Sequence, residues 1–481
     1  MTQSPYDDAA AIRGSTRAEK GSTRARVITR RERDRPMSNL MYARVDMGIS
    51  LAFHIIFASV GIALPLFMVI ADALYLRTGD RDYLELSRRM AKGTAIFFAV
   101  GAVSGTVLSF ELGLLWPSFM GTFGEVIGLP FGLEGIAFFT EAIFLGIYLY
   151  GRGKISNLSH LLSGVLVAVS GALSAFFVTL VNAFMNLPSG FRMAGGVIVD
   201  VDPLAAMWSA PWKHETLHVL LSAYEATAFA VVGIHAVFLL RRPASQIFRK
   251  GLAIVLAVAC VTALLQPLSG HHSAQSIARE EPLKLAAIEG HFETSRGAPI
   301  QVLGLPDPEA RTVRYAITIP KGLSLLSFND PDAEVQGLEA FPRDEWPNLT
   351  LVHGAFDVMV GAGSALALLA VVVGAIAIKK RGLPDSRNIL YALVAASPLG
   401  LVALEAGWFV TELGRQPWIV RGAMRTKDAV TPFPHIAAPF WLFAIVYVLL
   451  GVTVVYLLMR QLRAAPDKAP PSSVGDLGHA H

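Results

Sequence analysis

Long apolar blocks dominate this 481-residue sequence and restrict it to one class of fold. A membrane-spanning helix needs about 20 mostly apolar residues, and several blocks reach that length. Only 16% of the residues are charged, whereas soluble domains average about 25%. We therefore expect an all-α membrane protein, a bundle of nine transmembrane helices with a long outer loop between helices 6 and 7. The expected spans are residues 46–75, 93–117, 128–150, 161–185, 214–240, 252–269, 350–378, 388–413 and 436–459.

Basic residues gather in every second connection between these spans and after the last one. The positive-inside rule assigns such segments to the cytoplasm. We therefore expect a multi-pass protein of the bacterial cytoplasmic (inner) membrane, with the mature N-terminus and the long loop outside and the C-terminus in the cytoplasm. The basic residues are Arg77, Arg81, Arg88, Arg89, Lys92, Arg152, Lys154, Arg241, Arg242, Arg249, Lys250, Lys379, Lys380, Arg381, Arg460 and Arg463.

The pattern divides the chain into five parts. Residues 1–40 form a basic extension without an apolar signal core, which we interpret as disordered. Whether residues 1–36 belong to the mature protein stays open. Helices 1–6 occupy 41–269, the outer loop 270–349, helices 7–9 occupy 350–463, and a disordered tail follows at 464–481.

Cysteine usage limits the cofactors that the chain could hold. Cys260 is the single cysteine, which excludes an intrachain disulfide and covalent attachment of c-type haem. It also excludes cysteine-based iron–sulfur and zinc clusters. A cofactor would have to be held by His, Met or carboxylate side chains.

Two histidines lie well inside the expected spans in their outer half. His54 and His218 are each either hydrogen bonded to a neighbouring helix or an axial ligand to a metal or haem. His214 lies four residues before His218, at the expected water boundary, and we interpret it as a solvated residue. Met359 taken alone indicates core packing, although a His/Met pair from two helices also ligates low-spin haem.

Carboxylates form a second group of polar residues in the outer parts of the spans. Glu134 and Glu141 are seven residues apart, which is two helical turns, so they share a helix face. Glu405 and Glu412 repeat this spacing, and Glu111 lies near an outer helix end. Carboxylates at membrane depth serve proton relays or bind cations or cofactors, and a solvated helix end is the alternative.

Several short motifs make the chain resemble subunit I of the cytochrome bd-type quinol oxidases. The most specific is the run Glu-Leu-Gly-Arg-Gln-Pro-Trp at 412–418, which follows Glu-Ala-Gly-Trp at 405–408. The short loop is similar to that of the cyanide-insensitive branch. The other motifs are Arg44 with Phe53-His54 and residues 113–116, 133–135, 139–141, 218–224 and 284–289.

The resemblance implies three haems, a low-spin haem b and a close high-spin pair of haem b with haem d or a third haem b. His218 and Met359 match the iron ligands of the low-spin haem. His54 and Glu412 match the iron ligands of the high-spin pair, and which of them ligates the O₂-binding haem stays open. Three further residues match positions near the haems: Glu134, Trp408 and Arg415.

The resemblance also implies a proton path and a quinol site. Glu141 and Ser174 match the path, and Lys284 and Glu289 match quinol-binding residues of the outer loop. The implied partners are subunit II, a small single-span accessory subunit, membrane quinol, O₂ and the lipid bilayer, with no nucleic acid. Asp357 is a departure from the resemblance, because well-known members of the family carry Arg at that position.

Function is thus expected to be oxidation of membrane quinol at the outer face, coupled to electrogenic reduction of O₂ to water with protons from the cytoplasm. A haem-copper oxidase would need more intramembrane histidines than the 12 histidines of this chain supply. A proton-coupled transporter using the intramembrane carboxylates is the alternative from another class. It would predict inverted repeats and broken helices, and the sequence shows no signal of either.

Overall fold

The computed structural model describes residues 39–195, 197–383, 386–433 and 436–463. The predicted disordered segments lie outside these residues, except for 39 and 40, which begin the first helix. The described residues are mostly helical, as predicted, and short antiparallel strand pairs lie in the connections.

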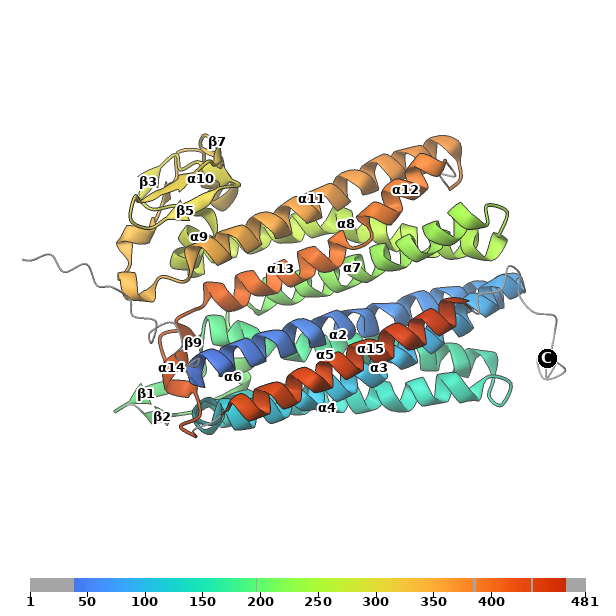
Figure 1. The fold of residues 1–481 in the computed structure, drawn as a ribbon, viewed down its shortest axis with the longest axis horizontal. Coiled ribbons are helices and arrows are strands. Elements are labelled where there is room, and N and C mark those ends of the chain that lie inside the picture. Colours follow the sequence, from blue (N-terminus) through green and yellow to red (C-terminus); the bar gives the residue numbers. More distant parts are fainter. Residues whose placement is uncertain (1–38, 196, 384–385, 434–435, 464–481) are drawn as a thin grey trace, which may run out of the picture. The chain divides into compact units, whose positions relative to one another are not determined.

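Nine spans in the described residues are long and apolar enough to cross a membrane, which confirms the predicted number. Their helices run side by side along one direction (Figure 1). They are α2 (Asn39–Thr78), α3 (Arg81–Leu115), α4 (Pro117–Gly151), α5 (Asn157–Asn186), α7 (Trp212–Arg241), α8 (Gln246–Glu280), α11 (Leu349–Lys380), α12 (Arg387–Ala396) with α13 (Leu399–Gly414), and α15 (Ala437–Arg463).

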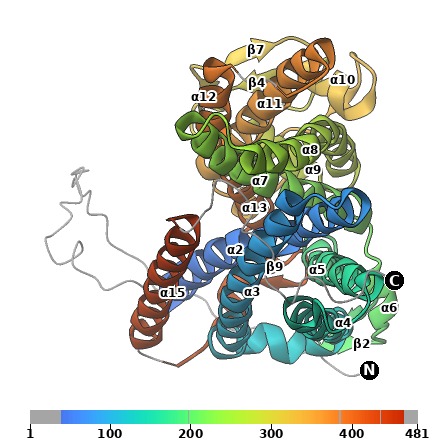
Figure 2. The same cartoon turned by 90° about the vertical axis from the view of Figure 1, so that its right-hand side faces the viewer.

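The two ends of the bundle differ in what connects the helices. One end carries the long segment 281–348, and we call it the loop end. The other has short connections such as 79–80 and 152–156, and we call it the basic end. Viewed from the basic end, α7, α8, α11 and α12 gather on one side and α3, α4 and α5 on the other (Figure 2).

Helices extend beyond the predicted spans, most clearly at α8. It continues to Glu280, so the connection to α11 covers 281–348 instead of the predicted 270–349. The sequence did not indicate this extension, because the residues after position 269 are polar. An apolar run marks only the part of a helix that lies in the membrane, whereas the helix itself can continue into water.

The eighth span is divided into α12 and α13 at Ser397 and Pro398, which corrects the expectation of unbroken helices. Pro398 lacks the N–H that would continue the helix. α7 packs closely against the break: a Cβ added to Gly233 would lie 2.3 Å from Ser397 Cβ, and one added to Gly400 would lie 2.6 Å from Ala226 Cα. Small residues therefore let the two backbones meet here.

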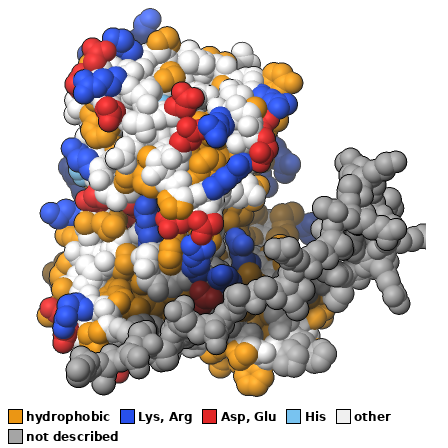
Figure 3. Space-filling model, turned by 90° about the vertical axis from the view of Figure 1, so that its left-hand side faces the viewer, with side chains coloured by type: hydrophobic (Ala, Val, Ile, Leu, Met, Phe, Trp, Pro, Cys, Tyr) orange, Lys and Arg blue, Asp and Glu red, His pale blue; other side chains and the backbone are white. Residues whose placement is uncertain are grey.

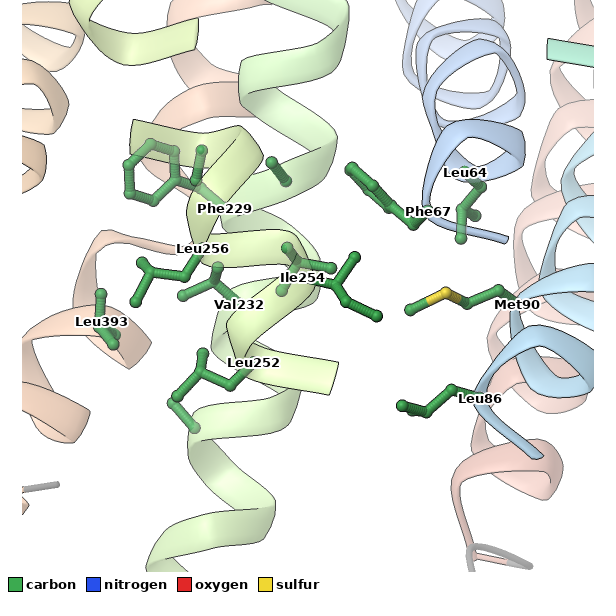
Figure 4. Close-up of a cluster of buried hydrophobic side chains, with 14 of the residues drawn as sticks. Leu64, Phe67, Leu86, Met90, Phe229, Val232, Leu252, Ile254, Leu256 and Leu393 are labelled. Carbon is green, nitrogen blue, oxygen red and sulfur yellow. The ribbon is translucent and has the colours of Figure 1, made fainter. Parts of the chain in front are cut away.

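A cluster of buried apolar side chains joins the helices toward the basic end (Figure 4). Phe67, Phe229 and Leu252 are almost fully buried there, and they come from α2, α7 and α8. Dispersion and close packing hold such a cluster together in a membrane, because lipid tails are as apolar as the side chains.

Segment 281–348 carries a short helix that packs inward and small strand pairs that face outward. In helix α9 (Pro282–Glu289), every residue from Leu283 onward is buried. Acidic and basic side chains are interspersed over the outward face (Figure 3), and several form salt bridges such as Lys321 with Asp332 at 2.6 Å. The remaining elements are α10 (Gly322–Phe328), the 3-10 helices η1 (Leu338–Ala340) and η2 (Arg343–Glu345), and the pairs β3 (Ser295–Arg296) with β8 (Glu334–Val335), β4 (Ile300–Val302) with β7 (Ile317–Ile319), and β5 (Leu305–Asp307) with β6 (Thr312–Arg314).

Candidate functional site

A buried polar network lies at the loop end between α5, α7, α9 and α13. Asn182 of α5 donates an amide hydrogen bond to Glu412 Oε1 at 2.5 Å. Arg415, just after α13, donates to Glu412 Oε2 at 2.5 Å. Glu412 is therefore held from two sides, and its carboxylate is oriented by a neutral amide and a buried guanidinium.

The same network continues to the inward-packed helix α9. Asn186, one turn beyond Asn182, accepts a hydrogen bond from Lys284 Nζ at 2.9 Å. Lys284 also pairs with Glu281 at 3.3 Å, and Arg421 donates to Glu281 at 3.0 Å. Contacts of this kind connect the predicted quinol residue Lys284 to the predicted iron ligand Glu412 through two amide side chains.

Glu215 joins the network, because its Oε1 accepts a hydrogen bond from Asn186 at 3.1 Å. Several atoms here are buried without a hydrogen-bond partner among the described residues: Nε and Nη1 of Arg415, Oε2 of Glu215 and Nε2 of the adjacent His214. The interpretation of His214 as a solvated residue is wrong, since this residue is only 5% exposed. Buried polar groups normally have partners, so these atoms mark a place where a polar ligand is expected.

His54 lies on α2 with its ring against α3. Its Nδ1 is 2.8 Å from Ser104 Oγ, and a Cβ added to Gly105 would lie 3.2 Å from its Cε1. A hydrogen bond at one ring nitrogen fixes the ring and leaves the other nitrogen for a metal.

His218 and Met359 also lie against an adjacent helix. His218 Nδ1 is 3.3 Å from Ser269 Oγ, Gln266 Nε2 lies 3.2 Å from His218 Nε2, and a Cβ added to Gly270 would lie 3.4 Å from His218 Cε1. Met359 of α11 lies against α13, where a Cβ added to Gly407 would lie 3.1 Å from its sulfur. Three of the four predicted iron ligands thus pack closely against a glycine of an adjacent helix, where a larger residue would crowd them.

These residues fit haem better than a bare metal ion. Within the described ranges, no three His, Cys, Asp or Glu side chains come together as a metal site. Haem needs only one or two axial ligands from the protein, because the macrocycle supplies the other four. The unpaired Arg415 atoms suit the negative charge of a haem propionate.

Both predicted proton-path residues, Glu141 and Ser174, lie along the contact between α4 and α5, together with Glu134. Ser174 donates to Glu134 Oε1 at 2.9 Å. Glu141, two turns further toward the basic end, is buried against Gly171, where an added Cβ would lie 3.4 Å from its carboxyl atoms. The structure thus brings Glu134 and Ser174 together and places Glu141 on the same helix face.

The second predicted quinol residue, Glu289, lies at the end of α9 and is 7% exposed. Burial, with a smaller contribution from Asp357, raises the pKa of Glu289 to about 8. His353 of α11 lies beside it: Nδ1 is 2.7 Å from the carbonyl oxygen of Ile288, and Nε2 is 3.4 Å from Asp357 Oδ2. Glu289 is therefore a carboxyl group that keeps its proton at neutral pH.

Other predicted residues lie apart from this network. Trp408 packs against a small apolar cluster that includes Ile55 and Leu404. Glu111 is fully buried and accepts a hydrogen bond from Ser50 at 2.6 Å. Glu405 has an Oε1 atom with no partner in the described part of the chain.

Sequence reasoning missed the residues that connect the network. Asn182, Asn186 and Glu215 lie near the ends of α5 and α7, where a polar side chain is ordinary. Their spacing carries a signal, because Asn182 and Asn186 are four residues apart and share one face of α5. Glu281 belongs to a charged run whose burial only the fold reveals.

Comparison with known proteins accounts for most of the chain. The profile of the family described as "Cytochrome bd terminal oxidase subunit I" matches residues 42–466. A Bacillus subtilis (strain 168) protein whose name includes "cytochrome bd menaquinol oxidase subunit I" is 39% identical over 436 residues, which are 89% of this chain and 98% of that protein.

Two further relatives agree with this match. The "Cytochrome bd ubiquinol oxidase subunit 1" of Bacillus subtilis (strain 168) is 30% identical over 450 residues, which are 90% of this chain and 95% of that protein. The solved structure of bd oxidase from Geobacillus thermodenitrificans superposes with a TM-score of 0.84 and 39% identity, covering 89% of this chain and 99% of that one.

Proposed function

The chain belongs to the cytochrome bd terminal oxidase subunit I family, and we propose that it carries the haems of an oxidase that oxidises membrane quinol and reduces O₂ to water. The relatives are named for menaquinol and for ubiquinol, so the proposal names quinol as a class. When bound, haem supplies the electron-transfer and O₂ chemistry, and the protein supplies ligands, orientation and protons.

The proposed orientation puts the loop end outside and the basic end in the cytoplasm of a bacterial cell. The charge asymmetry of the connections supports it. Segment 281–348 is then an outer quinol-binding region. A second large subunit and a small single-span subunit complete the proposed assembly, with exposed apolar helix faces against them or lipid.

The proposed iron ligands are His218 and Met359 for a low-spin haem b, and His54 and Glu412 for a high-spin pair of haem b with haem d or a third haem b. Ser104 and Ser269 orient the two imidazoles, and Asn182 orients the Glu412 carboxylate. Such outer hydrogen bonds set the direction of a metal ligand.

Lys284 and Glu289 are the proposed quinol-binding residues. Lys284 Nζ is a buried cation that can donate to a quinol oxygen, and Glu289 is a buried carboxyl that can exchange a proton with it. Both lie on α9, the element of segment 281–348 that packs onto the helices. Protons released at quinol oxidation would then leave on the loop side.

Glu141, Ser174 and Glu134 are the proposed carriers of protons from the basic end toward the haems. Their order along the α4–α5 contact supports this role. Because electrons enter from the loop side and protons from the other, each turnover separates charge across the membrane. The reaction is therefore proposed to be electrogenic.

The buried guanidinium of Arg415 is the observation that carries this proposal, because it holds Glu412 and keeps two further nitrogens, Nε and Nη1, that a bound anion such as a haem propionate would pair with. The test is the reduced-minus-oxidised optical spectrum of the purified membrane complex, followed by extraction and identification of its haems. We expect haem bands that quinol reduces and O₂ oxidises. A colourless complex would refute the proposal and favour a proton-coupled transporter.

A further inference from the structure

Five side chains, all but one of them buried, form a polar cluster near the basic end, far along the helices from the predicted iron ligands. Asp72 of α2 is fully buried and accepts hydrogen bonds from Arg152, from the Tyr148 hydroxyl at 3.2 Å and from His160 at 3.0 Å. Ser87 of α3 lies 2.7 Å from the Tyr148 hydroxyl oxygen. Four helices, α2 to α5, thus meet around one carboxylate.

His160 sits in a geometry that suits two protonation states. Its Nε2 is 3.0 Å from the carbonyl oxygen of Tyr148, which can only accept, so Nε2 carries a hydrogen. Its Nδ1 is 3.2 Å from an Arg152 nitrogen, a donor, and 3.0 Å from Asp72 Oδ2, an acceptor. Neutral His160 accepts from Arg152 and cationic His160 donates to Asp72, so neither state leaves Nδ1 unpaired.

The cluster is in contact with solvent through one residue. The side chain of Arg152 is 20% exposed, whereas those of Asp72 and His160 are 0% and 3% exposed. A proton arriving from water at the basic end therefore meets His160 through the Arg152 side of the ring.

The cluster also lies on the same helix faces as the proposed proton path. Tyr148 follows Glu141 by seven residues, two turns of α4, so both share a helix face. On α5, Gly164 lies against the Tyr148 ring and Gly171 lies against the Glu141 carboxyl group. The contact between α4 and α5 therefore repeats the same fit two turns apart.

Between these two levels lies an apolar layer. Leu145 of α4 and Val167 of α5 are buried there. The α-carbons of Tyr148 and Glu141 are about 10 Å apart along the helix axis, a distance that two or three hydrogen-bonded waters bridge. Proton passage therefore needs transient water in this layer.

We propose that His160, Asp72 and Tyr148 form the proton-loading site that feeds Glu141 from the basic end. This inference rests on the proposed function. His160 Nδ1 takes a proton from water, and Asp72 Oδ2 takes it from His160. The acid then donates it to the Tyr148 oxygen as the phenol proton leaves through water to Glu141. Each step breaks and forms one N–H or O–H bond, and no electron moves.

The test uses the purified complete oxidase with its partner subunits and two variants, His160→Gln and Tyr148→Phe. The first readout is the rate at which the Glu141 carboxyl exchanges its proton after transfer to D₂O, followed by its infrared C=O band. The second is turnover at saturating quinol as a function of pH. His235→Gln is the matched control, because His235 is a buried histidine on α7 that the proposed path does not use.

We expect both variants to slow the exchange of Glu141 and the turnover about tenfold, a modest loss for an acid–base relay. The deficit should grow with pH, because loading a proton becomes harder, while the KM for quinol and the haem spectrum stay unchanged. Wild-type exchange and turnover in Tyr148→Phe would overturn the proposal, even if His160→Gln fails to fold. A wild-type complex without haem bands would instead overturn the proposed function.

Discussion

The two polar clusters of the bundle differ in how completely they are paired. At the loop end, Arg415, Glu215 and His214 keep buried atoms without partners among the described residues. At the basic end, Asp72 and His160 have every polar side-chain atom within hydrogen-bonding reach of a neighbour. The first has buried polar atoms that the proposed ligand would pair with, and the second is paired within the protein.

That difference predicts different consequences of mutation. Mutations in a cluster that binds a ligand should change the stability of the protein little but should weaken or abolish binding of that ligand. A self-paired cluster should lose stability or proton transfer and keep the ligand.

The largest expected effect is loss of a cofactor at the loop end. His218→Ala or Met359→Leu should abolish the low-spin haem signal, because each removes a proposed axial ligand. The optical spectrum of the purified variants measures this. His160→Gln, which changes a histidine of the basic-end cluster, should keep all haem bands. Retention of the low-spin signal in both loop-end variants would contradict the ligand assignment.

The next effect is on stability. Asp72→Asn leaves Arg152 and the buried His160 without their carboxylate and should cost about 3–5 kcal/mol of unfolding free energy. Glu215→Gln should cost far less, because Oε2 of Glu215 is already unpaired. Denaturant unfolding in detergent compares the two variants. Equal losses would remove the distinction between the clusters.

A smaller effect, on turnover, is expected for Glu141, which lies between the two clusters. Glu141→Gln should slow turnover by about 10–100-fold, since the amide keeps the shape and cannot carry a proton. The haem spectrum serves as the internal control, because Glu141 is not a proposed ligand. Turnover equal to that of the wild type would exclude an essential proton role.

The smallest effect concerns pH. Because burial raises the pKa of Glu289 to about 8, this carboxyl holds its proton below that pH and becomes a proton acceptor above it. If quinol oxidation uses Glu289 as an acceptor, turnover at limiting quinol should rise, up to about tenfold per pH unit, as pH increases through 8. Glu289→Gln should flatten this rise, and an unchanged profile would argue against the role.

Sequence reasoning predicted the number of spans, because the thickness of a bilayer requires an apolar run of about 20 residues in each span. It missed the break at Ser397, because one Pro among apolar residues fits both a kink and a straight helix. It also named Glu412 and Lys284 and missed the amides of Asn182 and Asn186 between them. That connection depends on which helix faces meet, and only the tertiary packing of the helices determines which faces those are.

Because α9 is buried, a substrate can reach its residues only if the surrounding structure opens. Since Lys284 is 3% exposed, a quinol that binds there as proposed would reach it only when α9 or its surroundings shift. The measured affinity then includes the free energy of that shift, and about 1.4 kcal/mol of opening weakens apparent binding tenfold. A closed resting state would also keep stray reductants and water from the haems, so the residues that hold α9 down set both the access rate and the selectivity of the enzyme.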